Sequence, residues 1–361
     1  MDKKIAQILS HYDFASEVVR CEQFGVGHIN WTYRVETKSG ELYVLQRINT
    51  YVFRNPVGLM RNIELITNFM RKKEPDPRKV LELIPTSDGR TYVITDDDEY
   101  WRVYVYVKDS ICYDSAETPE IFCDTGRAFG HFQNLLSDFP VDSLIETIPD
   151  FHNTVARYQA FENAVGRDEK DRVKNAGKEI DYVLSQKPLA SFLLDKVAAG
   201  EIPLRVTHND TKINNVMFDR ITKKPLCVVD LDTTMPGVSA MDFGDSIRYA
   251  GNNAAEDEKD LDRVFLRMDL FRAFSEGFCG VSKQNLGRNE LIICPEASKL
   301  VTLEIGVRFL TDYLEGDVYF HTDYPEHNLT RARVQFKLAA DMDEKMNEMR
   351  DVIGTILDKK D

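Results

Sequence analysis

Hydrophobic and polar residues alternate in short runs through the first hundred residues, which is the spacing of half-buried β-strands. Residues 56–73 depart from this pattern, because Leu59, Ile63 and Ile66 recur at helical spacing and form one apolar face. Ser39-Gly40 separates two of the alternating runs and predicts a hairpin turn. The strands predicted in this part of the chain are 18–24, 30–37, 41–48, 80–85, 91–95 and 101–107.

After residue 108 the pattern becomes mainly helical. Thr118-Pro119 is typical of a helix start, and only residues 204–232 return to short apolar strands. The other helical stretches are predicted at about 153–165, 169–197, 257–279, 296–315 and 326–357. The sequence therefore predicts an α+β fold of two lobes, a small β-rich lobe over 1–108 and a larger, mainly helical lobe over 109–361.

Composition narrows the class of protein. The chain has 361 residues, with 46 Lys and Arg against 60 Asp and Glu, so its net charge is −14 with neutral histidines. This balance disfavours nucleic acid as a partner and adhesion to an anionic membrane surface. The N-terminus lacks the apolar core of a signal peptide, and no apolar run has the length of a membrane span. The six cysteines form no C-x-x-C pair, which disfavours zinc. We expect a cytoplasmic protein.

Residues 206–232 hold the most informative polar pattern. A polar loop from His208 to Asn215 precedes one short apolar strand, and a second apolar strand ends at Asp230. A hairpin of these strands would bring Asp230 beside Asn215, and a carboxylate with an amide oxygen suits Mg²⁺. Asp210 is then free to accept a proton from a substrate hydroxyl, and Lys212 could reach a transferring phosphoryl group. Singly, such residues more often cap turns or end strands, but their combination predicts phosphoryl transfer.

The spacing His208-x-Asp210-x-x-x-x-Asn215, followed by an apolar strand that ends at Asp230, resembles the aminoglycoside phosphotransferase and choline kinase superfamily, whose fold is protein-kinase-like. Within that superfamily the sequence is most similar to N-acetylhexosamine 1-kinases. The similarity rests on the strings Gly25-Val26-Gly27-His28-Ile29-Asn30, Tyr43-Val44-Leu45-Gln46-Arg47-Ile48-Asn49, His208-Asn209-Asp210-Thr211-Lys212, Asp230-Leu231-Asp232-Thr233, Asp242-Phe243-Gly244-Asp245-Ser246-Ile247-Arg248 and Arg308-Phe309-Leu310-Thr311-Asp312-Tyr313-Leu314.

The resemblance implies a role for each acidic residue of this region. Asp210 is implied as the catalytic base, with Lys212 beside it. Asn215 and Asp230 are implied as magnesium ligands, and Asp232 as an additional or supporting ligand. ATP and Mg²⁺ are the cofactors that follow.

Three further residues near the loop are expected to be structural. His208 is expected to hold the loop from inside the fold, as in kinase-like loops. Asp242-Phe243-Gly244 has the letters of the metal-binding triplet of protein kinases, but it does not follow the apolar strand after the loop. We therefore predict that Asp242 and Asp245 are acids of a helix start, and that Asp245 braces the catalytic loop.

A glycine-rich turn predicts where the phosphates bind. Gly25 and Gly27 lie between two predicted strands, where backbone N–H groups could approach phosphate oxygens. A G-x-G pattern by itself predicts only a tight turn, so this assignment depends on the motifs that follow it. The side chains expected to add hydrogen bonds are those of His28, Asn30 and Thr32.

The third predicted strand departs from the kinase pattern. A kinase-like lobe carries a lysine there, paired with a glutamate of the following helix, whereas this strand offers Gln46-Arg47. Either Gln46 or Arg47 replaces the lysine as the phosphate contact, and the two geometries differ. The adenine is expected to lie against the last strand of the lobe and its hinge, at Tyr104, Val105, Tyr106 and Val107.

The acceptor pocket is predicted from the helical lobe. Sugar hydroxyls and an N-acetyl group require polar side chains and an aromatic platform, and these residue types recur within 303–320. A helix end with ordinary surface ion pairs explains the same residues equally well. The acceptor-binding residues predicted are Arg308, Asp312, Asp317 and Tyr319.

These expectations combine into an ATP-dependent small-molecule kinase that acts on the anomeric hydroxyl of an N-acetylhexosamine. A first alternative is the same chemistry on another hydroxyl acceptor, namely an aminoglycoside, choline, ethanolamine or homoserine. A second is a nucleotide-binding pseudokinase, for which the substituted lysine position is the only support. Between Asp232 and Ala250 there is little room for an activation segment, which disfavours a protein kinase. No pattern in the sequence indicates an oligomeric state.

Overall fold

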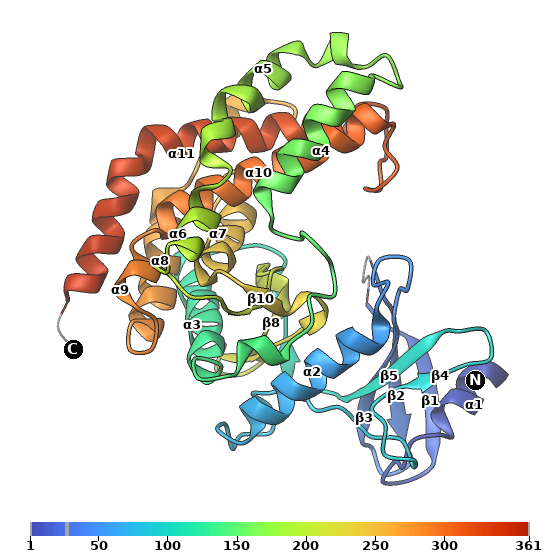
Figure 1. Cartoon of the computed structure of the whole chain (residues 1–361). Coiled ribbons are helices and arrows are strands. Elements are labelled where there is room, and N and C mark those ends of the chain that lie inside the picture. The colour runs from blue at the N-terminus through green and yellow to red at the C-terminus, as the bar shows by residue number, and fades with distance from the viewer. Residues whose placement is uncertain (1, 26–28, 360–361) are drawn as a thin grey trace. The chain divides into compact units, whose positions relative to one another are not determined.

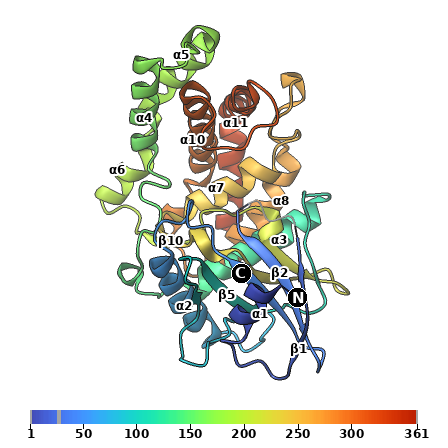
Figure 2. The same ribbon diagram turned by 90° about the vertical axis from the view of Figure 1, so that its right-hand side faces the viewer.

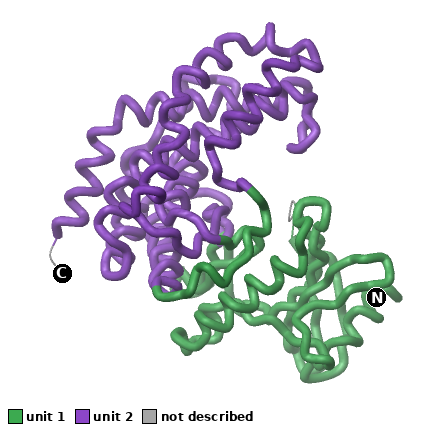
Figure 3. The backbone as a smooth tube through the Cα atoms, in the orientation of Figure 1, with its two compact units in different colours: residues 1–112, 138–149, 216–235 green, residues 113–137, 150–215, 236–361 purple. Residues whose placement is uncertain are grey.

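The computed structural model describes residues 2–25 and 29–359 (Figure 1). The chain forms two compact units, each assembled from separate stretches of sequence (Figure 3). The first unit consists of 1–112, 138–149 and 216–235, and the second of 113–137, 150–215 and 236–361.

The first unit contains an antiparallel sheet with the order β1-β2-β3-β5-β4. Strands β2 and β3 pair with Tyr33 opposite Leu45, and β3 and β5 pair with Gln46 opposite Arg102, whereas the register of β1 and β2 shifts between Val18 and Arg20. The turn predicted at Ser39-Gly40 is present, and Gly40 adopts a φ of 81°, which glycine tolerates without strain. The strands are β1 (Val18–Gln23), β2 (Trp31–Thr37), β3 (Leu42–Arg47), β4 (Val93–Ile94) and β5 (Tyr100–Val105).

The two faces of this sheet differ in chemistry. One face is apolar and packs against α1 (Lys3–Leu9), where Leu45, Trp101 and Val103 are buried. Because side chains alternate along a strand, Gln46 and Arg102 lie on the other face. Met60 of α2 (Pro56–Arg71) reaches Arg102 on that face, with its sulfur 4.0 Å from the guanidinium Nη1. The sheet therefore separates an apolar layer from a layer that contains a buried cation.

A smaller three-stranded sheet completes the first unit. Its order is β6-β8-β9, and the hairpin of β8 and β9 pairs Val216 with Val228. This confirms the hairpin predicted around residues 216–229. Asn215 immediately precedes β8, and Asp230 follows β9 by two residues. The bounds are β6 (Ser110–Ile111), β8 (Val216–Asp219) and β9 (Pro225–Val228), with 3-10 turns η1 (Val141–Ser143) and η5 (Leu231–Thr233).

The second unit is almost entirely helical. Its longest helices, α10 and α11, run side by side in Figures 1 and 2. The α-helices are α3 (Pro119–Leu135), α4 (Thr154–Arg167), α5 (Gly177–Gln186), α6 (Phe192–Ala198), α7 (Ser239–Ala250), α8 (Met268–Ser282), α9 (Arg288–Leu291), α10 (Cys294–Glu315) and α11 (His327–Asp358). The remaining elements are the 3-10 turns η2 (Val173–Asn175), η3 (Lys187–Leu189), η4 (Ile213–Asn215) and η6 (Leu261–Arg263), and β7 (Arg205–Thr207), which pairs with β10 (Met235–Gly237).

Close packing of α3 on α8 fixes the interior of this unit. A Cβ at Gly277 would lie 2.0 Å from the carbonyl oxygen of Cys123, and one at Gly126 would lie 2.5 Å from that of Phe274. Only glycine allows the two backbones to approach this closely. The Phe243 ring of α7 packs edge-on against this pair, 5.3 Å from the Phe274 ring centroid. Helix α7 is thereby anchored in the core, which matters because it supports the candidate active site.

The structure confirms most of the predicted elements and corrects four. Segment 80–85 is not a strand: Pro85 lacks the N–H of a ladder residue, and Leu83 makes only an isolated bridge to Tyr104. Segment 91–95 is reduced to the two residues of β4. Segment 169–197 is broken, since Pro188 cannot continue α5. Helix α8 begins only at Met268, because Asp260 caps a separate short turn before it.

The division of the chain also differs from the expected boundary. The predicted lobes meet at residue 108, whereas the first compact unit extends to residue 112 and also takes 138–149 and 216–235. The assignment of a nucleotide-binding lobe to 1–108 and a catalytic lobe to 109–361 stays a prediction. The described helices are all too short or too polar to cross a bilayer.

Candidate active site

The loop between β7 and β8 presents Asp210. It begins with the buried His208 and Asn209, and Asn209 adopts a φ of 65°, a left-handed conformation that is uncommon for a residue with a side chain. Such strain persists only where surrounding contacts hold the backbone. The first such contact comes from Asp242 in the first turn of α7, which accepts hydrogen bonds from the backbone N–H of His208 and Asn209, both at 2.8 Å.

Asp242 is a buried structural acid, as predicted. Gln133 of α3 also donates to its carboxylate, at 3.0 Å. Burial raises the pKa of Asp242, since the charged form loses its hydration there. The carbonyl oxygen of the same residue accepts a 2.5 Å hydrogen bond from the Thr211 hydroxyl. One residue of α7 therefore fixes both sides of Asp210.

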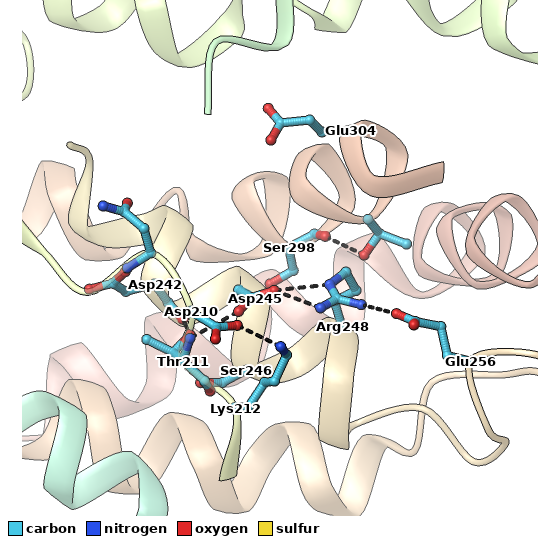
Figure 4. Close-up of polar contacts among 12 residues, drawn as sticks. Asp210, Thr211, Lys212, Asp242, Asp245, Ser246, Arg248, Glu256, Ser298 and Glu304 are labelled. Atoms are coloured by element: carbon cyan, nitrogen blue, oxygen red, sulfur yellow. Dashed lines mark hydrogen bonds and ion pairs between the residues drawn. The ribbon is translucent and has the colours of Figure 1, made fainter. Parts of the chain in front are cut away.

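Asp245 braces the same loop one helical turn later, also as predicted (Figure 4). Its carboxylate accepts the backbone N–H of Thr211 at 3.0 Å and pairs with Arg248 at 2.9 Å. Burial by itself would raise the pKa of Asp245, but Arg248 and Lys212 together hold it below its ordinary value. The Ser246 hydroxyl donates to the Thr211 carbonyl at 2.7 Å. Helix α7 thus supports the loop backbone through four hydrogen bonds, made by the side chains of Asp242, Asp245 and Ser246.

Asp210 itself is partly exposed and lies between two donors. The Lys212 ammonium is 2.9 Å from its Oδ1, and the Asn215 amide nitrogen is 3.3 Å from its Oδ2. Asn215 also donates to the Asp210 carbonyl at 2.8 Å, which closes the loop. Burial would lower the pKa of Lys212, but the neighbouring Asp210 outweighs it and raises that pKa. The structure thus brings together three predicted site residues, Asp210, Lys212 and Asn215.

His208 points into the core of the second unit, as predicted. Its ring lies edge-on to Phe129 and Phe132 of α3, with centroids 5.7 and 6.0 Å apart. Its Nδ1 accepts the backbone N–H of Asp210 at 3.3 Å. The residue therefore holds the loop and is not exposed to a reacting group.

Sequence reasoning missed His152, which also contacts the loop. Its Nε2 lies 3.4 Å from the Asn209 carbonyl oxygen, and its Nδ1 pairs with the fully buried Glu304 of α10 at 2.7 Å. Thr154 donates to the other oxygen of Glu304 at 2.6 Å. Burial would lower the pKa of His152, but Glu304 raises it above its ordinary value. The sequence offered one indication of this pair: Glu304 is a charged residue among the apolar positions of α10.

The acidic turn of the first unit contains the other predicted metal ligands. Asp230 is exposed and adopts a φ of 59°, another left-handed non-glycine residue. Asp232 is buried; its Oδ2 accepts a hydrogen bond from Asn30 and its Oδ1 forms an ion pair with Arg102, both at 2.6 Å. The predicted phosphate contact Asn30 is therefore committed to Asp232 within this unit, and its Oδ1 accepts the backbone N–H of Asn49.

Arg102 lies on the strand predicted to border the nucleotide, but sequence reasoning assigned it no role of its own. It is fully buried, and its Nη2 and Nε donate to the Gln46 Oε1 at 2.9 and 3.1 Å. Gln46 in turn donates to the Thr32 hydroxyl at 3.1 Å. The position of Arg102 could have indicated its role, because it is the cross-strand partner of Gln46, the residue at the expected lysine position.

The same geometry separates the two residues proposed to replace the lysine. Arg47 lies on the opposite face of β3, where it pairs with Glu99 at 2.8 Å and stacks 3.5 Å above the Trp31 ring. Gln46 shares the face of Asp232 through Arg102. Which of the two residues contacts phosphate stays a prediction, since the Gln46 amide is itself engaged by Arg102 and Thr32.

The other predicted nucleotide contacts are described in part. Gly25 has a φ of 78°, consistent with a tight turn, whereas Gly27 and His28 lie outside the described residues. Tyr104 is buried with its ring 5.1 Å from the Arg102 guanidinium.

Part of the hinge backbone is engaged within the first unit. Val105 N–H donates to the Glu82 carbonyl at 2.9 Å, and Tyr106 N–H to that of Leu42 at 3.1 Å. The Val107 carbonyl accepts from the Ser110 hydroxyl. An adenine contact at residues 104–107 stays a prediction, and it would involve backbone groups other than these three.

Two of the four predicted acceptor residues are structural. Asp312 is buried and accepts the backbone N–H groups of Val318, Tyr319 and Phe320 at 2.8–3.0 Å, so it caps the loop after α10. Asp317 pairs with Arg172 at 2.5 Å. Both carboxylates also accept from Asn328 of α11. We therefore correct the assignment of Asp312 and Asp317 as substrate contacts.

Arg308 and Tyr319 have side chains suited to binding a polar ligand, a guanidinium and an exposed aromatic ring. The Arg308 guanidinium lies 5.4 Å from the Phe151 ring and 5.8 Å from that of Tyr319, which is 61% exposed. A second guanidinium, Arg157, is close enough to Arg308 that burial and this neighbour lower the pKa of Arg157. The surface therefore combines aromatic rings with two cations.

Magnesium binding by Asn215, Asp230 and Asp232 stays a prediction, and the donor atoms of each residue can be compared with it. Asp230 offers an exposed carboxylate, and Asn215 offers its amide oxygen, since its nitrogen contacts Asp210. Asp232 fits less well as a direct ligand, because one of its oxygens pairs with Arg102 and the other accepts from Asn30. The described residues include no cluster of three His, Cys, Asp or Glu ready to hold a metal.

A profile of the phosphotransferase enzyme family matches residues 20–271, a range that includes both candidate regions. The chain belongs to this family. Similar solved structures include an aminoglycoside phosphotransferase from Alicyclobacillus acidocaldarius subsp. acidocaldarius, with a TM-score of 0.65, 14% identity and coverage of 97% of this chain and 96% of that chain. A microcompartment-associated aminopropanol kinase has a TM-score of 0.62 at 15% identity, covering 96% and 98%.

An amicoumacin kinase in complex with AMP-PNP and Ca²⁺ is similar too, with a TM-score of 0.58, 14% identity and coverage of 93% and 91%. At these identities the likeness shows the fold. The two-lobed, kinase-like α+β fold and the superfamily of small-molecule phosphotransferases are thereby confirmed. The N-acetylhexosamine subtype is a finer assignment, taken up below.

Proposed function

We propose that the protein is an ATP- and Mg²⁺-dependent kinase that transfers the γ-phosphoryl group to the anomeric hydroxyl of an N-acetylhexosamine. The observation that carries the reaction class is Asp210, a partly exposed carboxylate on a loop held by buried acids, with Lys212 at 2.9 Å. A base that must meet a hydroxyl needs a fixed position more than a shifted pKa. The bracing by Asp242 and Asp245 supplies that position.

Each residue then has a separate task. Asp210 orients the acceptor hydroxyl and takes its proton. Lys212 balances the Asp210 charge and faces the transferred phosphoryl group. Asn215 and Asp230 would hold Mg²⁺, which when bound neutralises charge on the β- and γ-phosphates.

The acceptor proposal rests on Arg308 and Tyr319. A guanidinium donates to sugar hydroxyls and to an N-acetyl carbonyl, and an exposed tyrosine ring can lie against the apolar face of a hexose. A cationic acceptor is disfavoured because Arg157 and Arg308 would repel it. This argument opposes choline, ethanolamine and aminoglycosides, although similar structures are named for kinases of amine-containing compounds.

The test is ATP consumption with Mg²⁺ across N-acetylglucosamine, N-acetylgalactosamine, glucose, galactose, choline, homoserine and kanamycin. Preference for N-acetylated hexoses with a 1-phosphate product by NMR would support the proposal. Turnover of choline or kanamycin without sugars would keep the reaction and overturn the acceptor. ATP binding without turnover of any acceptor would favour the pseudokinase alternative.

A further inference from the structure

The lysine missing from β3 leaves open how the first unit supplies a cation near the acidic turn. Arg102 is a fully buried arginine on the neighbouring strand, and it faces the same side of the sheet as Gln46. Gln46, which stands at the expected lysine position, accepts hydrogen bonds from the Arg102 guanidinium at 2.9 and 3.1 Å. A buried guanidinium persists only where it is paired, and here the partner is Asp232 at 2.6 Å.

The contacts of this pair extend to the segments predicted to bind the nucleotide. Asp232 lies two residues after Asp230 and accepts from Asn30, which follows the glycine-rich turn. Asn30 in turn accepts the backbone N–H of Asn49, after β3. One ion pair therefore links the acidic turn, the residues after the glycine turn and two strands of the sheet.

The charges of the acidic turn also indicate that Arg102 supports it. With Asp232 neutralised by Arg102, Asp230 is the exposed carboxylate of this turn. Burial would lower the pKa of Arg102, but the neighbouring Asp232, with a further contribution from Asp230, outweighs it and raises that pKa. Removing the guanidinium would leave Asp232 as a buried, uncompensated charge close to where phosphates are proposed to bind.

We infer that Arg102 takes the place of the missing β3 lysine as a positioning residue: through Asp232 and Gln46 it fixes the acidic turn and Asn30 for binding of the nucleotide triphosphate. The residue does not touch the nucleotide, because it is fully buried. A kinase-like lobe pairs the lysine of its third strand with a glutamate. Here a cation and an acid are also paired, but the cation is Arg102 of β5 and the acid is Asp232, in the turn after β9. This inference rests on the proposed function.

The test measures the dissociation constant of AMP-PNP by calorimetry, with and without Mg²⁺, so it needs no acceptor. Arg102→Met is expected to weaken binding about tenfold or more, the effect of losing charged hydrogen bonds. Arg102→Lys, which keeps the charge, is expected to recover part of that loss. The matched control is Arg78→Met, which breaks an Arg–Asp pair with Asp219 elsewhere in the same unit.

Folding is controlled by a second variant. Arg102→Met combined with Asp232→Asn removes both charges, which costs far less stability than leaving one unpaired. If this double variant is folded by circular dichroism and binds AMP-PNP within twofold of the parent, the inference is overturned. It is also overturned if Arg47→Met weakens binding and Arg102→Met does not. A parent protein that binds no nucleotide would overturn the proposed function, and the inference with it.

Discussion

The loop at 208–215 and the turn at 230–232 both present an aspartate, but they are held by opposite means. In the loop, buried carboxylates of α7 accept backbone N–H groups, so Asp242 and Asp245 hold the main chain. In the turn, a buried guanidinium holds a side chain, since Arg102 pairs with Asp232. Asp210 and Asp230 are the more exposed aspartate of each region.

The difference concerns how the support is distributed. The loop is held at His208, Asn209 and Thr211 by separate hydrogen bonds, so the loss of one leaves others in place. In the turn, the buried Asp232 pairs with Arg102 and accepts from the amide of Asn30. We therefore expect changes at the loop supports to act mainly on stability, and changes at the turn support to act mainly on nucleotide affinity.

The largest effect is expected at the reactive position of the loop. Asp210→Asn keeps the shape of the side chain but removes the base, so kcat should fall by about 10²–10⁴-fold. Nucleotide affinity should change little, because the supports of the loop remain. Steady-state kinetics and AMP-PNP calorimetry measure the two quantities. A kcat within threefold of the parent would remove Asp210 as the base.

A second effect separates support from reaction. Asp242→Asn places an amide NH₂ against backbone N–H donors, and the loss of these charged hydrogen bonds in the interior should cost about 2–4 kcal/mol of unfolding free energy. Denaturant unfolding measures this cost. The matched control is Asp181→Asn on α5, an exposed residue for which the change should stay within about 0.5 kcal/mol. Equal losses in the two variants would contradict the supporting role.

The sequence predicted the loop better than the turn, and the reason is physical. The contacts among Asp210, Lys212 and Asn215 are local in sequence, so these three residues could be placed by spacing. The support of the turn joins Arg102, Gln46 and Asp232, which are distant in sequence and meet only through the register of β3 and β5. No periodicity reports which strand supplies a buried cation.

The acceptor residues show the same limit. Arg308, Asp312, Asp317 and Tyr319 are polar positions of one short segment, and sequence does not distinguish a loop cap from a ligand contact. The structure does so through three backbone N–H groups that Asp312 accepts. The helices around them were predictable because their apolar spacing is long and regular.

A smaller effect tests that distinction. Arg308→Lys keeps a positive charge but loses the planar fork, so KM for the acceptor should rise about tenfold with little change in KM for ATP. Asp312→Asn, the matched comparison at the end of the same helix, should lower thermal stability and leave both KM values within about twofold. An acceptor KM raised by Asp312→Asn and not by Arg308→Lys would reverse the two roles.

The smallest effect concerns His152, whose ring reaches the loop from a third direction. The groups that face it are Glu304 and Arg308 of α10, Asp245 of α7 and the Asn209 carbonyl. Its pKa is raised in the folded state, so its stabilising contribution is complete below about 6.5 and is lost as pH rises through the folded value. The pKa of Glu304 is lowered by His152 against the opposing effect of burial, so its contribution is lost only as pH falls below that of an ordinary glutamate.

The pair should therefore stabilise the fold most in mildly acidic solution. Between about pH 5.5 and about pH 8.5, unfolding free energy should fall more in the parent than in His152→Gln, which keeps an amide donor but does not titrate. Denaturant unfolding at both pH values, with His11→Gln as the exposed control, measures the difference. Parallel pH dependence of the parent and His152→Gln would show that the Glu304 contact is made by a neutral imidazole. In that case His152 would support the loop through neutral hydrogen bonds. The buried charges that support the loop would then be those of Asp242 and Asp245 in α7.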